Sequence, residues 1–216
     1  MESFRTLLHR HPRLLVIDTA SSVTQVGFLR DLGGEQRWAE EPADSGEAIF
    51  ACLERLQIKI KDMDAIAFCE GPGSILGIRT AASVIRTWLS LFPRATFAYG
   101  SLELLAWSLG EVEVGVIADA RRDLWHVVET DAAGRPTPLR KAKPNELPRL
   151  LRTPDTFKSW AAFPPGVQQT PYRLADLLPK VMDAPLLHAR PEPDALLLEP
   201  ASYVRWAPKI HRAHQV

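Results

Sequence analysis

Asp18 and Thr19 end a short apolar run, LLVID at residues 14–18, and the small residues Ala20-Ser21-Ser22 follow them. An apolar run of this length suits a buried strand, so the carboxylate is expected where that strand ends. There it would face a turn whose amides and hydroxyls can hold a phosphate or a metal-bound water. The alternative is an Asx turn that only closes a hairpin. The spacing alone favours this second interpretation.

A glycine-rich segment, GPGSILG at residues 71–77, forms a second candidate site before a long helical pattern. Gly71, Gly73 and Gly77 let the backbone approach a ligand closely, and Ser74 can cap the helix. The start of a helix offers free N–H groups and a partial positive charge, which suit an anion. The segment lacks the Gly-Lys-Ser/Thr ending of a P-loop. The alternative is a tight connection from strand to helix, and the sequence does not separate the two.

Asp119 begins a third candidate, the segment DARRD at residues 119–123. It is either a charged hairpin loop or an acid and two guanidiniums at the mouth of a cleft between two lobes. We expect no metal site, because no HExxH or HxxxH spacing occurs and Cys52 and Cys69 have no metal-ligand spacing. The two cysteines are expected to be buried thiols. No serine lies in a G-x-S-x-G elbow, and we assign no catalytic residue.

Mixed α/β elements must position these residues in the first half of the chain. Short apolar runs separated by turns predict strands, and the first three strands form an antiparallel meander. Apolar residues at helical spacing predict helices, of which the second carries a wide apolar stripe and the third is capped by Ser101. The expected strands are 14–18, 23–29, 35–40, 65–69 and 95–99, and the expected helices are 45–57, 76–92 and 102–109.

The second half of the chain is richer in proline and harder to assign. Ten of 12 glycines lie in residues 1–115, and 14 of 18 prolines lie after residue 130. We therefore predict a first lobe over residues 1–108 that carries the motifs, and a smaller, proline-rich second lobe over 109–216. In the second lobe we expect strands at 112–118, 124–129 and 160–163, helices at 145–152 and 171–181, and mostly extended chain from 191 to 216.

Composition limits the classes of function. Lys+Arg and Asp+Glu number 26 each, so the formal net charge is zero, and a general nucleic-acid-binding surface is not expected. The basic stretch at 135–152 contains no aromatic residue and is interpreted as a solvated face. Low net charge makes a protein partner more plausible. No apolar run approaches the roughly 20 residues of a membrane span, so we expect a cytoplasmic protein without a membrane segment.

Four segments in this order resemble the TsaB (YeaZ) family: LLVIDTASSVTQVGFL, DMDAIAFCEGPGSILGIRTAASV, YGSLELLA and VGVIADARRDLWHVV. The resemblance covers about residues 14–130 and is most specific at 66–101. After residue 135 it is reduced to Pro200-x-x-Tyr203-x-Arg205. It implies an α/β fold of the actin, Hsc70 and sugar-kinase type, which is ribonuclease H-like and has two lobes with the second reduced.

The resemblance also implies a role. TsaB is a non-catalytic subunit in the formation of N6-threonylcarbamoyladenosine at position 37 of tRNAs that read ANN codons. It forms a heterodimer with TsaD, and the ATPase TsaE joins the pair. For this chain we therefore expect a TsaD-like subunit and a TsaE-like ATPase as partners, with tRNA met indirectly. The HxxxH metal motif of TsaD has no counterpart here.

Three positions depart from the usual family pattern. Ala20 stands where the family usually has serine, Ile75-Leu76 stands in place of Phe-Thr, and the usual His-Ser is replaced within Ala43-Asp44-Ser45-Gly46. Each change removes a polar group that would face the cleft. The implied role requires no cofactor, and ATP or ADP is the candidate ligand. Its expected contacts are Asp18, Thr19, Gly71, Gly73, Ser74, Gly77 and Asp119.

In the family, two helices pack against their equivalents in TsaD as a four-helix bundle, which here implies the helices at 45–57 and 76–92. The alternative is that the apolar stripe is entirely intramolecular core. Two other functions stay open: a small phosphotransferase that uses Asp18 and the 71–77 loop, and a nucleotide-sensing homodimer formed through the same helices. The expected interface residues are Ile49, Leu53, Ile78, Ala81, Ala82, Ile85 and Trp88.

Overall fold

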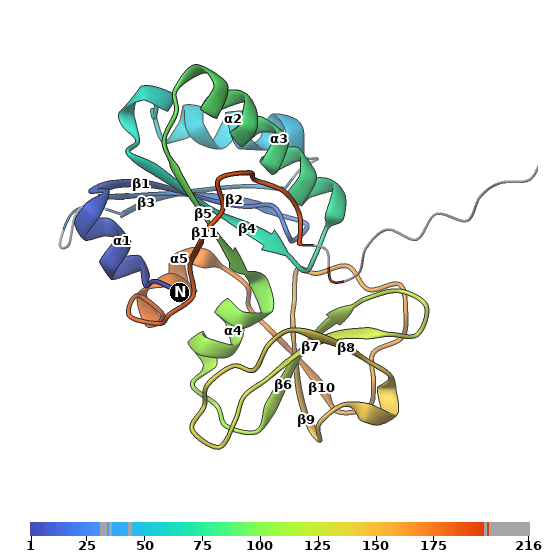
Figure 1. The fold of residues 1–216 in the computed structure, drawn as a ribbon. Helices are drawn as coiled ribbons and strands as arrows, with labels where there is room; N and C mark the ends of the chain where they lie inside the picture. The colour runs from blue at the N-terminus through green and yellow to red at the C-terminus, as the bar shows by residue number, and fades with distance from the viewer. Residues whose placement is uncertain (31–33, 35, 43–44, 197, 199–216) are drawn as a thin grey trace, which may run out of the picture.

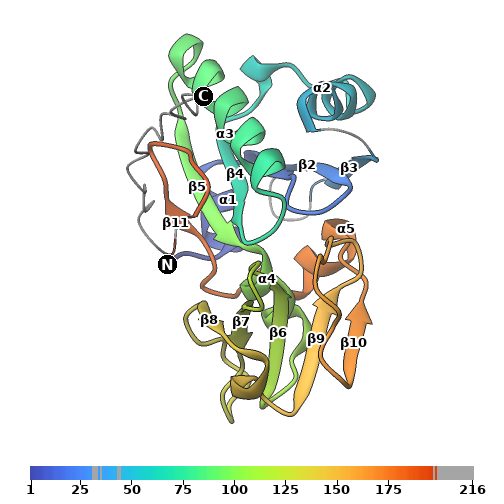
Figure 2. The same ribbon diagram turned by 90° about the vertical axis from the view of Figure 1, so that its right-hand side faces the viewer.

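The protein consists of two lobes, each built on one β-sheet (Figures 1 and 2). The computed structural model describes residues 1–30, 34, 36–42, 45–196 and 198. The first sheet has the strand order β11-β5-β4-β1-β2-β3, and the second has the order β10-β9-β6-β7-β8. The predicted two-lobed α/β fold class is therefore confirmed.

The first sheet begins with the predicted antiparallel meander, to which parallel strands are added. Leu14 and Val16 pack into the core on one face of this sheet, whereas Leu15 and Ile17 pack into the core on the other face. This is why the run LLVID is apolar throughout instead of alternating. The strands are β1 (Arg13–Asp18), β2 (Thr24–Arg30), β3 (Gln36–Glu41), β4 (Ala65–Gly71), β5 (Ala95–Gly100) and β11 (His188–Ala189).

Helices cover both faces of the first sheet (Figure 1). On one face lie α2 (Ser45–Arg55) and α3 (Ile75–Leu91), whose buried side chains form one core with β1 and β4. On the other face lie α1 (Phe4–Arg10), α4 (Ser101–Leu109) and the short α5 (Leu174–Leu177). In the part of the chain that the structure describes, no helix is long and apolar enough to cross a membrane.

The second lobe is a five-stranded mixed sheet joined to the first lobe through α4. This helix packs against β4 and β5 on one side and against β6 and β7 on the other, so it lies between the two sheets. The loop after β9 covers the far face of the second sheet, where Phe163 meets Trp125 at 5.8 Å between ring centroids. The strands are β6 (Val114–Asp119), β7 (Trp125–Glu129), β8 (Arg140–Ala142), β9 (Leu150–Pro154) and β10 (Val167–Thr170).

Several predictions for the second half are wrong. The predicted helix at 145–152 is a 3₁₀ turn, Pro144–Glu146, followed by β9, because residues 150–152 pair in parallel with β6. The predicted strand at 160–163 is irregular, and β10 follows it instead. The predicted helix at 171–181 is interrupted, with α5 followed by the 3₁₀ turn Leu178–Lys180.

Ser101 does not cap α4 either. The capping position is Gly100, and the Ser101 hydroxyl instead donates a hydrogen bond to the Pro72 carbonyl at 2.5 Å. A further 3₁₀ turn, Ile60–Asp62, precedes β4. Most of the connection between the second and third strands, the departure at residues 43–46 and the Pro200-x-x-Tyr203-x-Arg205 segment lie wholly or partly outside the described residues.

The last part of the second half returns to the first lobe. Residues 188–189 pair with β5, and Glu2 exchanges backbone hydrogen bonds with Leu187. Farther along, the Leu196 N–H donates to the Glu70 carbonyl at 2.8 Å. The boundary near residue 108 thus separates the strands of the two sheets with the exception of β11.

Candidate functional site

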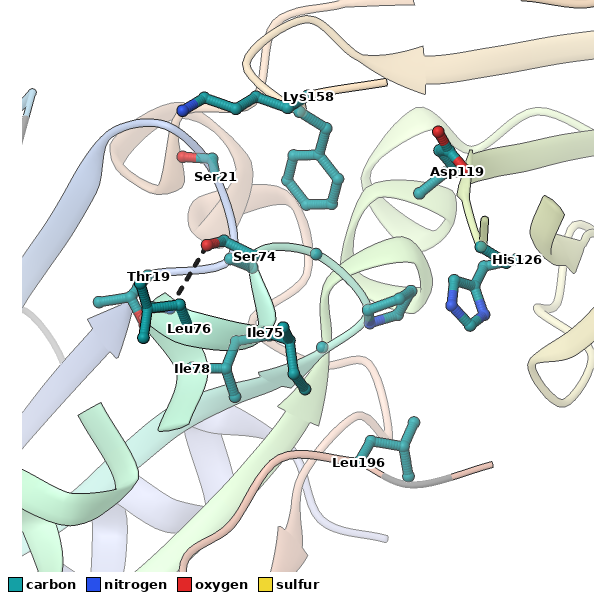
Figure 3. Close-up of a pocket in the computed structure, with 18 of the residues that line it drawn as sticks. Thr19, Ser21, Ser74, Ile75, Leu76, Ile78, Asp119, His126, Lys158 and Leu196 are labelled. Atoms are coloured by element: carbon teal, nitrogen blue, oxygen red, sulfur yellow. Dashed lines mark hydrogen bonds between the residues drawn. The ribbon is translucent and has the colours of Figure 1, made fainter. Parts of the chain in front are cut away.

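A cleft of about 1160 Å³ lies between the two lobes, and Figure 3 shows it from close range. The turn after β1, the loop from β4 to α3 and the end of β6 all line it, so the structure brings the three candidate segments together. Asp18 is the one predicted nucleotide contact that does not line the cleft. The six that do are Thr19, Gly71, Gly73, Ser74, Gly77 and Asp119.

The loop before α3 is held close to the turn after β1. The Ser74 N–H donates to the Ala20 carbonyl at 2.7 Å, and the Ser74 hydroxyl caps α3 by accepting from the Gly77 N–H at 3.3 Å. Gly73 has a φ of +153°, and a Cβ there would lie 2.3 Å from the Ala20 carbonyl oxygen. A Cβ on Gly77 would meet the Thr19 carbonyl oxygen at the same distance. Only glycine permits this approach.

Asp18 is completely buried, and its carboxylate accepts hydrogen bonds from residues that are far apart in the sequence. Its Oδ2 accepts hydrogen bonds from the hydroxyls of Tyr99 at 3.0 Å and Tyr172 at 2.8 Å, and its Oδ1 accepts one from the Ala20 N–H at 2.9 Å. Burial raises the pKa of the Asp18 carboxyl despite these donors. Because the carboxylate is closed off from the cleft, Asp18 has a structural role. We call Asp18, Ala20, Tyr99 and Tyr172 the Asp18 cluster.

Asp119 lines the cleft, but its carboxylate accepts hydrogen bonds from backbone N–H groups of its own lobe. One oxygen accepts from the N–H groups of Trp160 at 2.6 Å and Ala161 at 3.1 Å, and the other accepts from the Arg121 N–H at 2.6 Å. Desolvation raises the pKa of Asp119, but these backbone donors outweigh it and lower the pKa below its ordinary value. Asp119 therefore positions the loop that carries Trp160. The Arg121 guanidinium lies over the Trp160 ring, 4.2 Å from its centroid.

Sequence reasoning missed the contribution of the loop after β9. Phe157, Lys158 and Trp160 line the cleft from the second lobe, opposite the start of α3. The Ser22 N–H donates to the Thr156 carbonyl at 3.0 Å, which ties this loop to the turn after β1. No motif marks these residues, because their place depends on contacts with the distant segments that carry Ser22 and Asp119.

Glu70 forms a second charged group at the rim of the cleft. Its side chain is only 5% exposed, and its carboxylate lies 3.2 Å from His188 Nε2 and 3.5 Å from Arg190 Nε. The hydrogen bond with Glu70 raises the pKa of His188. These contacts fasten the β11 region to β4. Within the described residues, no group of three His, Cys, Asp or Glu side chains could hold a metal ion.

The seven predicted interface residues lie under the helices rather than on their outer face. All are between 0 and 7% exposed: Ile49, Leu53, Ile78, Ala81, Ala82, Ile85 and Trp88. Five of them pack in the core between the helices and the sheet, whereas Ile78 belongs to the core on the other face and lines the cleft. For these side chains the intramolecular interpretation describes the structure, because the sheet already covers them. A partner on these helices would meet other residues. The foremost is Phe50, which is 52% exposed and stands edge-on to the Trp88 ring at 6.3 Å.

Comparison with known proteins shows similarity to a TsaD family model and to solved structures of YeaZ. Residues 45–135, from α2 to just beyond β7, match the family model of TsaD, described as tRNA N6-adenosine threonylcarbamoyltransferase. No curated protein sequence matches the chain. Among solved structures, YeaZ from Pseudomonas aeruginosa superposes with a TM-score of 0.56 at 19% identity, covering 78% of this chain and 90% of that one.

A second solved structure, an uncharacterized protein from Pseudomonas aeruginosa with similarity to peptidase YEAZ, gives a TM-score of 0.57 at 20% identity. The alignment covers 78% of this chain and 89% of that chain. The two sheets, the joining helix and the cleft define a two-lobed α/β protein. Within that class, the chain is a divergent protein with the fold of YeaZ, the TsaB fold.

Proposed function

We propose that the chain is a non-catalytic scaffold subunit in the formation of N6-threonylcarbamoyladenosine at position 37 of tRNA. It pairs with a TsaD-like subunit and helps recruit a TsaE-like ATPase. The observation that carries this proposal is the match of residues 45–135 to the TsaD family model in a chain with the fold of YeaZ. Because the net charge is zero, the tRNA is met chiefly through the partner.

The Asp18 cluster supports a scaffold over a phosphotransferase. A catalytic carboxylate must touch the substrate, a bound metal ion or the attacking group. The Asp18 carboxylate is 0% exposed and accepts three hydrogen bonds from within the protein. The cleft therefore lacks the acid that the phosphotransferase alternative assigned to it.

The outer face of α2 and α3 is suited to close packing against helices of a partner. Phe50 supplies an exposed apolar group above Trp88. On α3 the hydroxyls of Thr80 and Thr87 donate to carbonyls of their own helix, to Leu76 and Ser83, each at 2.9 Å. A hydroxyl that is already bonded can be covered without losing a hydrogen bond to water. These hydroxyls on the outer face are thus already hydrogen-bonded, and Phe50 is the exposed aromatic anchor of that face.

Co-expression with the TsaD-like subunit of the same organism tests the proposal, with light scattering and a titration to measure the complex. We expect a stable heterodimer, and we expect Phe50→Asp to raise its Kd about 30-fold, as for loss of an anchor worth about 2 kcal/mol. Val112→Asp is the matched control, because Val112 is equally exposed but lies outside this face. Trp88→Asp is unsuitable, since Trp88 belongs to the core.

Two results would contradict the proposal. One is separate elution of the two proteins at micromolar concentration. The other is self-association of this chain that Phe50→Asp abolishes while the TsaD-like subunit has no effect, which would favour the homodimer.

A further inference from the structure

After the second lobe, the chain returns to the first lobe as a strap, residues 188–196, which runs beside β5 and reaches the cleft (Figures 1 and 2). The first two residues of the strap pair with β5, and the Arg190 N–H donates to the Thr96 carbonyl at 2.8 Å. At the far end, the Leu196 N–H donates to the Glu70 carbonyl, and Figure 3 shows Leu196 at the wall of the cleft. The strap therefore joins the edge of the first sheet to the cleft.

Few buried side chains hold the strap in place. Of residues 188–196, only Pro193 and Ala195 are buried. From α3, the Arg86 guanidinium holds the middle of the strap by donating to the Pro193 carbonyl at 2.6 Å. A segment that buries little apolar surface and is held mainly by hydrogen bonds can open without unfolding of the whole protein. The strap has both properties, so we expect it to open more readily than the sheets.

Glu70 contacts the strap at both of its ends. The backbone carbonyl of Glu70 accepts from the Leu196 N–H at 2.8 Å. Its buried carboxylate lies 3.2 Å from His188 Nε2 and 3.5 Å from Arg190 Nε at the beginning of the strap. Glu70 is followed directly by Gly71, the first residue of the loop that leads along the cleft to α3. One residue thus fixes both ends of the strap and adjoins the cleft loop.

The contact between His188 and Glu70 changes with pH. His188 faces the carboxylates of Glu70 on β4 and Glu103 on α4, and it also faces the Arg190 guanidinium of the strap itself. The hydrogen bond with Glu70 raises the pKa of His188, against desolvation and the charge of Arg190. Protonated His188 therefore stabilises the closed strap fully below the ordinary histidine pKa of about 6.5, and this contribution is lost as pH rises through the folded value.

We propose that the strap opens independently of the rest of the first lobe, and that Glu70 and His188 form its pH-sensitive latch. Protonated His188 holds the strap closed. Loss of the proton releases the strap, which uncovers the edge of β5 and withdraws Leu196 from the wall of the cleft. The contact between Glu70 and Arg190 remains, so the release is partial. The inference goes beyond the scaffold role, and neither depends on the other.

Hydrogen exchange of the full chain, measured by NMR at about pH 5.5 and about pH 8 and corrected for the intrinsic exchange rate at each pH, tests the proposal. The amides of Arg190 and Leu196 report opening at the two ends of the strap. The Thr130 N–H, which donates to the Val114 carbonyl at 2.9 Å in the second lobe, reports unfolding of the whole protein. We expect the strap amides to be less protected than Thr130. Their protection should fall about fivefold at the higher pH, the size expected for a partly exposed ion pair.

His188→Gln and Glu70→Gln each remove one partner of the latch. Both variants should show at the lower pH the weak protection that the wild type reaches only at the higher pH, and both should lose the dependence on pH. His9→Gln is the matched control, because it removes an exposed histidine of α1 outside the strap, and it should behave like the wild type. The proposal is overturned if the strap amides are as protected as Thr130, if their protection in the wild type does not change with pH, or if either latch variant keeps the pH dependence. None of these outcomes affects pairing with the TsaD-like subunit, which Phe50→Asp tests separately.

Discussion

Replacing Tyr172 by phenylalanine removes one hydrogen bond from the Asp18 cluster and leaves the packing in place. The Tyr172 hydroxyl donates to Asp18 Oδ2 at 2.8 Å, and both side chains are fully buried. The backbone of Tyr172 is held separately, by Asp155 at its N–H and by Gln25 at its carbonyl. The ring also keeps its edge contact with Phe157. The substitution is therefore expected to act on the hydroxyl alone.

The expected loss of unfolding free energy is about 2 kcal/mol, because a hydrogen bond to a charged group contributes roughly 1.5–3 kcal/mol and no water can replace this one. Urea unfolding followed by circular dichroism at mildly alkaline pH, where the carboxylate form is favoured, measures it. With an m-value of about 2 kcal/mol per molar, the midpoint falls by roughly 1 M.

Asp18→Asn supplies the control for this prediction. In that background the Tyr172 hydroxyl donates to a neutral amide, and its removal should cost only about 1 kcal/mol. The assignment of the Asp18 cluster would be refuted if Tyr172→Phe costs less than about 0.5 kcal/mol, or if its cost is the same in both backgrounds. Either result would mean that the carboxylate does not depend on the tyrosine.

Two further predictions follow from contacts at the edge of the cleft. Gly73→Ala should destabilise the protein by about 1–3 kcal/mol, because its Cβ would lie 2.3 Å from the Ala20 carbonyl oxygen and its φ is positive. Gly46→Ala is the control and should leave the stability unchanged, because a Cβ there meets nothing. Equal urea midpoints for the two variants would contradict this prediction. The pKa of His188 should be raised by its hydrogen bond with Glu70, so its stabilising effect is complete below the ordinary value of about 6.5 and is lost as pH rises through the folded value. NMR titration checks this, and an unchanged His188 pKa in Glu70→Gln would exclude Glu70 as the cause.

The first lobe could be predicted from the sequence because its periodicities are local and long. The stripe on α3 recurs at helical spacing over 17 residues, and the run LLVID has the length of one buried strand. The short α1 was missed, since its apolar face consists only of Phe4, Leu7 and Leu8. In the second lobe, Leu147 and Leu151 follow helical spacing, but residues 150–152 pair with β6, and pairing decides the structure there.

The candidate site was predicted in outline but not in its energetics. The three segments were identified because strand ends and glycine loops mark a cleft in the sequence itself. The sequestration of Asp18 could not be predicted, because Tyr172 lies 154 residues away and belongs to no motif. The same holds for Lys158 and Trp160, whose position depends on the hydrogen bonds of Ser22 and Asp119. For the outer face of the helices, apolar spacing identified the buried stripe, whereas Phe50 lies off it.

The return of β11 to the first sheet has a consequence for synthesis on the ribosome. In the part of the chain that the structure describes, residues 188–190 cover the outer edge of β5, and Glu2 pairs with Leu187. During translation, the edge of β5 in the first lobe therefore stays unpaired until the residues of β11 have been synthesised. An open edge can pair with other chains. We expect a product truncated before residue 182 to aggregate, because it leaves the edge of β5 open.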